Sequence, residues 1–372
     1  MNRLVLIGNG FDLAHGLKTS YKNFIFWYWD QWGNRLLHSL ERTDTDGLCS
    51  FKIKDNIEVQ HWASVFQGWY YKRENPSIPW KTNDVINLAM KDRNLCDFKI
   101  TSSLLLRIWN KLACGWVDIE NEYYSLLRLR SSRIDPSTEQ DIKDLNIHLN
   151  TLQFYLINYL RTEEKKGTEN IDEIKDKIYR PIMKNEIAVA NQMFSGNRLG
   201  DSVPSDVMLL NFNYTNTAEQ YVTDPSKVEV NYIHGKLDNP ESIIFGYGDE
   251  LDEDYKALQE LNENECLRHI KSIHYLESDH YRKVLEFIES APFQIIIMGH
   301  SCGNSDRTLL NTLFEHKNCV SIKPYYYKRG ENDDNYIELV QNISRNFKDM
   351  KLMRDRVVNK TYCEPLTNRK NK

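Results

Sequence analysis

Leu4-Val5-Leu6-Ile7-Gly8-Asn9-Gly10 is the stretch of the sequence that decides the fold. Residues 4–7 are an uninterrupted apolar run that ends at a glycine, which is typical of a buried parallel strand. A Gly-x-Gly turn between such a strand and a helix allows a phosphate to approach backbone N–H groups closely. The full GxGxxG motif is absent, because Asp12 stands where it would continue. An ordinary glycine turn explains Gly8 and Gly10 about equally well, and their place after the first strand favours a phosphate site.

Strand patterns return after residue 206 and alternate with helical patterns. The predicted strands are residues 207–210, 228–233, 293–298 and 319–322, with 242–245 as a weaker candidate. The predicted helices between them lie within residues 253–288, 305–316 and 335–349. Such alternation predicts an α/β fold with a mostly parallel sheet, here of the Rossmann-like type.

Residues 21–199 differ in character and are predicted to form a large helical insertion between the first strand and the others. Within it, residues 102–129 have the pattern of one long amphipathic helix, and residues 141–161 have that of another. The predicted domains are therefore a Rossmann-like nucleotide-binding core (residues 1–20 plus 200–350), the helical insertion (21–199) and a C-terminal tail (351–372). The basic end of the tail is expected to be disordered.

Bulk composition restricts the partners and the compartment. The chain has 48 Lys and Arg against 53 Asp and Glu, a net charge of −5, which gives no general attraction to nucleic acid or to an anionic membrane. Its 7 cysteines include no CxxC pair, so neither a disulfide framework nor a cysteine zinc site is indicated. The first apolar run is too short for a signal peptide or a membrane span. We expect a cytoplasmic protein with reduced thiols, no membrane partner and no metal.

Polar residues follow the second predicted strand, where ligands of open α/β sheets bind. Asn211, Asn213 and Tyr214 belong to the segment Asn-Phe-Asn-Tyr-Thr-Asn. Their amides can hydrogen-bond ribose hydroxyls or a carboxamide. Asparagines here can equally cap the next helix, and at least one of the three asparagines is expected to do only that.

Two further motifs follow later strands. His234 and Gly235 end one strand, and a histidine there can accept a proton near neutral pH, although a lone histidine is more often structural. Gly246 and Gly248 flank Tyr247 in a segment that predicts either a flexible loop for this side chain or a simple turn.

Gly299-His300-Ser301-Cys302-Gly303 follows the strongest strand and matches the G-x-S-x-G pattern of a nucleophile elbow. The next helix is predicted to be capped by Ser305 or Asp306, so the turn is too long for a tight elbow. The segment is therefore predicted to be a phosphate or ribose loop instead of a serine nucleophile.

Glu120 in the insertion is a candidate for the same site. Trp116, Glu120 and Tyr124 share one helix face at i, i+4 and i+8. A glutamate on that face can project into a cleft, but a surface salt bridge beside a core tryptophan is at least as common for such spacing.

Taken together, these motifs resemble the AbiH family. Residues 6–17 with Thr19-Ser20-Tyr21 resemble the N-terminal signature of that family. Later blocks follow in the expected order, at residues 116–120, 211–215, 233–235, 245–248 and 299–306. The resemblance spans nearly the whole chain and implies a bacterial defence protein linked to abortive infection.

A more distant resemblance is to sirtuin-like NAD-binding domains of bacterial defence systems. It rests on the Gly-x-Gly loop, on Asn213-Tyr214, on His234-Gly235, and on Gly299, Ser301 and Asp306. It implies that the asparagine positions the nicotinamide ribose or a water and that the histidine is a general base. Thr215 stands where aspartate is usual, which bears on catalysis more than on binding. Absence of a CxxC module argues against a protein deacetylase.

The leading hypothesis is that the core binds NAD or a related nucleotide and hydrolyses its N-glycosidic bond. His234 would be the base, Asn213 would orient the ribose or water, and Glu120 or Asp12 would stabilise a cationic transition state. The expected ligand contacts are Gly8, Asn9, Gly10, Phe11, Asp12, Asn211, Tyr214, Gly235, Gly246, Tyr247, Gly299, His300, Ser301 and Asp306. The alternatives are a non-catalytic sensor of a nucleotide or a phage-derived trigger and, disfavoured by charge, a nucleic-acid effector. The sequence leaves open whether the protein forms a homo-oligomer.

Overall fold

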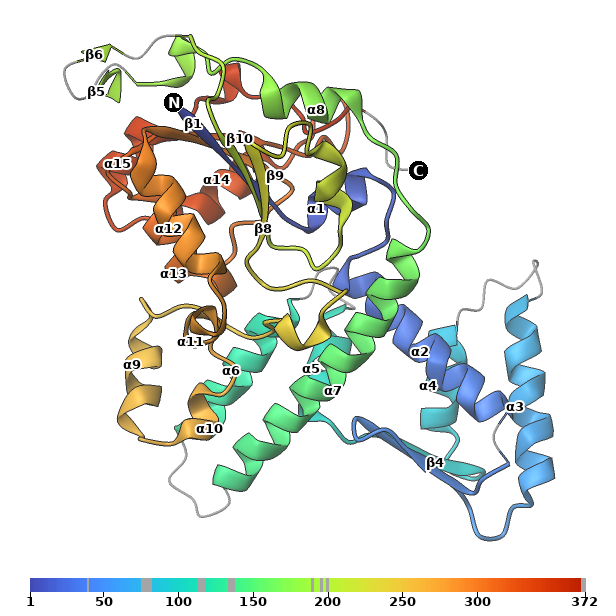
Figure 1. Cartoon of the computed structure of the whole chain (residues 1–372). Helices are drawn as coiled ribbons and strands as arrows, with labels where there is room; N and C mark the ends of the chain where they lie inside the picture. Colours follow the sequence, from blue (N-terminus) through green and yellow to red (C-terminus); the bar gives the residue numbers. More distant parts are fainter. Residues whose placement is uncertain are drawn as a thin grey trace. The chain divides into compact units, whose positions relative to one another are not determined.

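Five strands pair in parallel to form one sheet in the order β10-β9-β1-β7-β8 (Figure 1). They are β1 (Asn2–Ile7), β7 (Val207–Asn211), β8 (Val228–Tyr232), β9 (Phe293–Met298) and β10 (Cys319–Tyr325). The computed structural model describes the chain except for residues 39, 75–81, 113–117, 133–137, 189–190, 195–196, 199–200 and 369–372. All residues of β1 and β9 are buried, as strands covered on both faces require.

Successive side chains of β1 point to opposite faces of the sheet and enter two separate apolar clusters. Leu4 and Leu6 pack in one cluster, and Val5 and Ile7 pack in the other. The first cluster is covered by α12 (His280–Ser290), α13 (Arg307–Phe314) and α14 (Tyr336–Arg345). The second is covered by α1 (Asn9–Ala14), α8 (Asp172–Tyr179) and η3 (Thr217–Tyr221). The predicted α/β class with a mostly parallel sheet is confirmed.

The chain divides into two compact units, and the boundary falls inside α7 (Thr138–Glu164). We call Met1–Thr19 with Leu160–Lys372 the sheet unit, and Ser20–Tyr159 the inserted unit. Residues 160–199, placed in the insertion by the sequence, therefore belong to the sheet unit. None of the helices in the described part of the chain combines the length and apolar character needed to cross a bilayer.

Two predicted elements of the sheet unit differ from the structure. Residues 242–245 form no strand: η4 (Pro240–Ser242) leads into a loop in which Ile244 N donates to His234 O at 3.0 Å. Residues 253–288 form separate helices because the chain turns at Asn262, which has a φ of 56°. These helices are α9 (Glu253–Glu260), α10 (Asn264–Leu267), α11 (Lys271–His274), η5 (Tyr275–Glu277) and α12.

The C-terminal segment is described up to Asn368. Of the basic end that was expected to be disordered, residues 367–372, Thr367 and Asn368 are held against the Glu173 carboxylate of α8, which corrects the expectation for these two residues. After α15 (Met350–Arg356) and η7 (Lys360–Tyr362), the chain returns to α8. Lys177 Nζ donates to Pro365 O at 2.9 Å, and Asn368 N donates to the Glu173 carboxylate at 3.1 Å. The last four residues lie outside the described ones.

The inserted unit is not purely helical. β2 (Thr43–Thr45), β3 (Cys49–Ile53) and β4 (Cys96–Ile100) form an antiparallel sheet that the sequence did not predict. The helices are α2 (Tyr21–His38), α3 (Val59–Glu74), α4 (Thr82–Lys91), α5 (Ser103–Leu112), α6 (Ile119–Ser131) and most of α7. The predicted single helix over residues 102–129 is wrong, because Asp118 is extended and its carboxylate caps Glu120 N and Asn121 N at the start of α6. Elsewhere, short elements are β5 (Met193–Phe194), β6 (Asn197–Arg198), η1 (Lys184–Glu186) and η6 (Asn304–Asp306).

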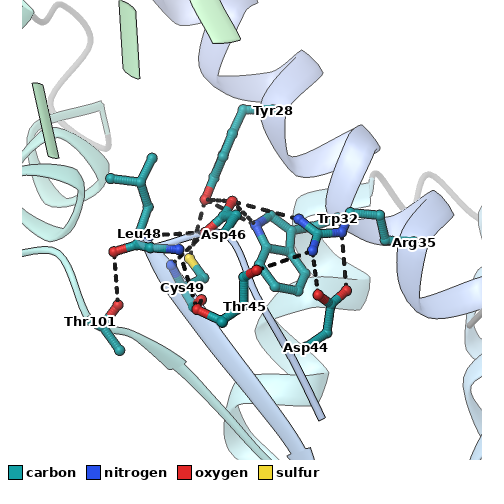
Figure 2. A network of polar contacts seen from close by, with 10 residues as sticks. Tyr28, Trp32, Arg35, Asp44, Thr45, Asp46, Leu48, Cys49 and Thr101 are labelled. Carbon is teal, nitrogen blue, oxygen red and sulfur yellow. Dashed lines mark hydrogen bonds and ion pairs between the residues drawn. The ribbon is translucent and has the colours of Figure 1, made fainter. Parts of the chain in front are cut away.

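A buried network ties the β2–β3 hairpin to α2 (Figure 2). The Asp46 carboxylate accepts from Leu48 N at 2.9 Å and from Cys49 N at 2.8 Å, which closes the turn. The same carboxylate accepts from the Tyr28 hydroxyl and from the Trp32 indole N–H, each at 2.9 Å. Burial raises the pKa of both Tyr28 and Cys49, so neither group ionises near neutral pH. The network is structural, since its donors and acceptors satisfy one another.

Candidate functional site

Four of the motif-bearing loops emerge at one edge of the sheet. Numbered along the chain from 1 to 5, the strands lie in the order 3-2-1-4-5, so the direction of progression reverses between β1 and β9. Because all five are parallel, the loops after β1, β7, β8 and β9 leave from the same edge. The structure therefore brings together segments that are separated by up to 298 positions in the sequence, from Gly8 to Asp306.

The glycine turns after β1 and β9 pack directly on each other at this reversal. Gly8 N donates to Met298 O at 3.2 Å, and Gly10 N donates to Gly299 O at 2.9 Å. A Cβ on Gly8 would lie 2.5 Å from His300 Cα, and one on Gly299, whose φ is +76°, would lie 2.1 Å from Phe11 N. Close approach of two backbones thus explains these glycines, and the N–H groups of Gly8 and Gly10 are already bonded to protein carbonyls.

Asp306 lies at this edge of the sheet, and its carboxylate contacts one lysine ammonium group and two histidine rings. Lys271 Nζ lies 2.8 Å from Oδ1, His234 Nε2 lies 3.3 Å from Oδ1, and His300 Nε2 lies 3.5 Å from Oδ2. Lys271 is 1% exposed and Asp306 is 7% exposed. Burial acts to raise the pKa of Asp306, but Lys271 and the two histidines outweigh it and hold this pKa well below its usual range. Asp306 is therefore an ionised carboxylate throughout the physiological pH range.

His234 is held as a neutral imidazole. Its burial lowers its pKa, and the positive charge of Lys271 lowers it further, against the opposing effect of Asp306. Nε2 faces Asp306 and also lies 3.3 Å from the Tyr275 hydroxyl, so the proton belongs on Nε2. Among the described residues Nδ1 has no hydrogen-bond partner, which leaves it as the atom that can accept a proton.

The second histidine is fixed by its own loop. His300 Nδ1 accepts from Cys302 N at 3.0 Å, which places its proton on Nε2, toward Asp306. Phe212 packs against both imidazoles, with ring centroids 4.1 Å from His300 and 5.4 Å from His234. Cys302 has a φ of 54° and its carbonyl accepts from Asn346 Nδ2 at 2.9 Å, so α14 braces this turn.

Asp12 forms a second buried polar group at the same edge. Thr215 Oγ1 donates to Asp12 Oδ2 at 2.6 Å, and Asp12 Oδ1 has no hydrogen-bond partner among the described residues. Burial raises the pKa of Asp12 to about 6. Thr215 thus serves here as the donor to a neighbouring carboxyl.

The asparagines after β7 brace the loops. Asn213 Nδ2 donates to Gly8 O at 3.0 Å, and Asn211 Nδ2 donates to Thr215 O at 3.1 Å. Neither side chain caps η3, whose N-cap residue is Asn216. Their amides therefore hold the β1 and β7 loops in register, and Asn213 stands directly beside the glycine turn.

The loop after η4 positions Lys271. Tyr247 N donates to His269 O, and Lys271 N donates to Tyr247 O, each at 2.9 Å. A Cβ on Gly246 would lie 1.9 Å from His269 O, and one on Gly235, whose φ is +80°, would lie 2.1 Å from Ser242 O. Both glycines are thus required by close backbone packing.

Other predicted residues belong to the inserted unit, lie outside the described residues or act differently. Glu120 belongs to α6 of the inserted unit, and Trp116 lies outside the described residues. Ser301 is exposed and its carbonyl accepts from Asn342 Nδ2 at 2.9 Å. Asp306 does occupy the N-cap position of α13, but its side chain makes no capping bond and binds Lys271 instead.

Lys271 is the residue that the sequence reasoning missed. It lies in His-Ile-Lys-Ser-Ile-His, a segment without a recognisable motif, and lysines are almost never fully buried unless they are paired.

Within the described residues, no group of three or more His, Cys, Asp or Glu side chains could hold a metal ion.

A comparison with protein families decides the assignment. The family model described as "Bacteriophage abortive infection AbiH" matches residues 4–327. The chain belongs to the AbiH family. Membership implies a role in bacteriophage abortive infection. No curated protein matches the chain.

The matched range of this AbiH protein includes all the strand-end groups described above, from Gly8 to Asp306. It ends before α14, and Asn342 in this helix and Asn346 at its C-cap brace the loop after β9. The polar cluster therefore lies wholly within the part of the chain that matches the family, and part of its support lies beyond it.

Proposed function

We propose that this AbiH protein binds NAD or a related nucleotide at the carboxyl edge of its sheet and hydrolyses the N-glycosidic bond, so that cofactor loss halts an infected cell. The observation that carries the proposal is the buried His234–Asp306 pair beside the reversal of strand order. The order 3-2-1-4-5 supports the proposal, because it matches the first five strands of the 3-2-1-4-5-6 order of Rossmann folds, in which nucleotides bind at the reversal. Neutral His234 with a free Nδ1 has the protonation state of a general base.

In the proposed reaction, the oxygen of a water forms a bond to C1′ of the ribose while the bond from C1′ to nicotinamide breaks. The electron pair of that bond returns to the nicotinamide ring, which leaves as a neutral molecule. His234 Nδ1 takes the proton of the water and later releases it to solvent. Asp306 keeps the other imidazole proton on Nε2 and stabilises the imidazolium. Ionised Asp12 stabilises the cationic sugar of the transition state.

Side chains carry the ligand contacts in this proposal. The N–H groups of Gly8, Gly10 and Phe11 donate to protein carbonyls, so the glycines shape the site by letting its loops approach. Asn9 and Ser301 are exposed side chains of the β1 and β9 loops, and we assign them to the ribose or phosphate groups.

Purified full-length protein incubated with NAD, with and without phage lysate as trigger, tests the reaction through chromatographic detection of nicotinamide. His234→Ala should lower turnover by about 10²–10⁴-fold, the usual contribution of a general base. His61→Ala, at an exposed position of α3, is the matched control and should keep full turnover. NAD that stays intact under every condition, with the wild type equal to His234→Ala, removes the reaction. Calorimetric binding of NAD without nicotinamide release would instead favour a nucleotide sensor.

A further inference from the structure

We propose that a cavity beside β8 binds a sugar phosphate. The cavity has a volume of about 220 Å³ and lies between the edge strand β8, the loop after it and α12. Its polar lining comprises Glu229, Asn231, Lys236, Ser242, His280 and Lys283, together with Asn239. The volume is below the ~300–1,000 Å³ of pockets for drug-sized ligands, so it suits a small metabolite. None of these side chains belongs to the Asp306 cluster, so the proposal does not depend on NAD hydrolysis.

The strongest sign of a missing partner is Asn231. This residue is 3% exposed, and its Nδ2 donates to His280 O at 2.8 Å, which fixes the orientation of the amide. Its Oδ1 has no hydrogen-bond partner among the described residues. Since buried polar atoms are nearly always hydrogen-bonded, an orphan acceptor on a residue that lines the cavity points to a donor that the described residues do not supply.

Two more acceptors line the same cavity. His280 Nδ1 lies 2.5 Å from Tyr232 O, so Nδ1 is the donor of this bond, and Nε2 is the ring nitrogen that a ligand hydroxyl can meet. Glu229 is exposed and adds a carboxylate. Neighbouring hydroxyl groups of a sugar supply the several O–H donors that such a set of acceptors needs.

Two lysines supply the opposite charge. Lys236 Nζ lies 3.5 Å from Asp238, and Lys283 Nζ lies 3.1 Å from Asp279, whose side chains are 72% and 63% exposed. Such exposed pairs hold their partners weakly, so both ammonium groups can turn to a bound anion. The acceptors of the cavity suit the hydroxyl groups of a sugar, and the two ammonium groups suit a phosphate. Together they match a sugar that carries a phosphate.

Titration calorimetry on the full chain tests the site with ribose 5-phosphate, ADP-ribose, ribose and inorganic phosphate. Ribose 5-phosphate should bind with a dissociation constant of about 1 mM or below, and ribose or phosphate alone should bind at least about tenfold more weakly. ADP-ribose is also the product of the proposed NAD hydrolysis, so its binding supports this cavity only if Lys236→Ala and Lys283→Ala weaken it. ADP-ribose binding that both variants leave unchanged belongs to the Asp306 edge and counts against the cavity.

Lys236→Ala and Lys283→Ala should each weaken binding by about tenfold, because each removes a charge-assisted hydrogen bond. Lys227→Ala, at an exposed residue just before β8 and outside the lining, is the matched control and should bind as the wild type does. Binding that is unchanged in both cavity variants, equally tight binding of inorganic phosphate, or no saturable binding of either sugar phosphate overturns the proposal. Nicotinamide release serves as a separate readout, so failure of NAD hydrolysis and failure of this site are distinguishable.

Discussion

Breaking the Lys271–Asp306 pair should destabilise the sheet unit by several kcal/mol. Lys271 Nζ is 2.8 Å from Asp306 Oδ1, and both residues are buried. At an effective dielectric constant of about 20, unit charges at this separation attract by about 6 kcal/mol. Desolvation of the two ions offsets much of that attraction. Removing one partner leaves the other charge buried and unpaired, which typically costs about 3–5 kcal/mol.

A double-mutant cycle measured by urea unfolding gives the decisive number. Lys271→Met and Asp306→Asn should each lower the free energy of unfolding by about 3–5 kcal/mol, and the double variant should lose at least about 2 kcal/mol less than their sum. The double variant has no charged side chain at either position, whereas each single variant leaves one charge buried without its partner. Glu253→Gln, which removes an exposed carboxylate paired with Lys256, should leave the unfolding midpoint unchanged. If the loss in unfolding free energy of the double variant equals the sum of the two single losses, the two residues are not energetically coupled and the argument is refuted.

The same pair predicts how stability depends on pH. Because the pKa of Asp306 is well below its usual value in the folded state, its stabilisation is fully present above the unfolded pKa and is lost as pH falls through the folded one. The wild type should therefore exceed Asp306→Asn in stability at pH 7, and the difference should shrink below about pH 3. A difference that stays constant from neutral to acidic pH would show that the carboxylate is not held ionised by its neighbours.

Three further predictions concern other parts of the fold. Gly299→Ala should cost about 3 kcal/mol or more in urea unfolding, because its Cβ would meet the backbone at 2.1 Å, whereas Gly167→Ala, with φ +69° and open space, should cost about 1 kcal/mol. Asp46→Ala should destabilise the inserted unit by about 2–4 kcal/mol and reduce the near-ultraviolet dichroism of Trp32, because the hairpin donors lose their acceptor. Equal costs for the two glycine variants, or an unchanged Trp32 signal, would contradict these explanations. With a folded pKa of about 6, Asp12 binds more protons in the folded state than in the unfolded state. Wild-type stability should therefore fall relative to Asp12→Asn by about 2 kcal/mol as pH rises from 4 to 7, and parallel profiles would exclude the shifted pKa.

Continuous apolar runs made the central sheet predictable. The strands near residues 207–210 and 293–298 are buried on both faces, and this leaves an uninterrupted pattern in the sequence. Placement of their loops at one edge follows once the strands are parallel. The break at Asn262 was not predictable from periodicity, because the apolar spacing continues through it while the backbone turns.

The small sheet of the inserted unit has a sequence pattern that could have predicted it. Cys-Ser-Phe-Lys-Ile at β3 and Cys-Asp-Phe-Lys-Ile at β4 both alternate apolar and polar residues, and Phe51 pairs with Phe98. Each segment is only five residues long and lies between polar stretches, so its alternation was outweighed by the helical patterns around it. A search for period-two segments that match each other would have found the pair.

The candidate site was predictable in position but not in chemistry. His234 and Asp306 stand at strand ends, whereas Lys271 comes from α11 and reaches Asp306 only because the loop around Tyr247 holds its backbone. Sequence spacing does not encode such a contact between residues 35 positions apart. Burial lowers the pKa of His234 and this lysine lowers it further, so the sequence predicted His234 as a base but could not predict its protonation state.

The glycines of the motifs are poor probes of function for the same structural reason. Gly8, Gly235, Gly246 and Gly299 each face neighbouring backbone so closely that a Cβ would lie 2.5 Å or less from a backbone atom. Loss of activity in such a variant would report a displaced loop, whether or not the loop touches a ligand. Side-chain variants around Asp306 avoid this ambiguity when a fold measurement accompanies them. A variant of His234 that keeps its unfolding midpoint but loses turnover would separate chemistry from packing, which no glycine substitution at this edge can do.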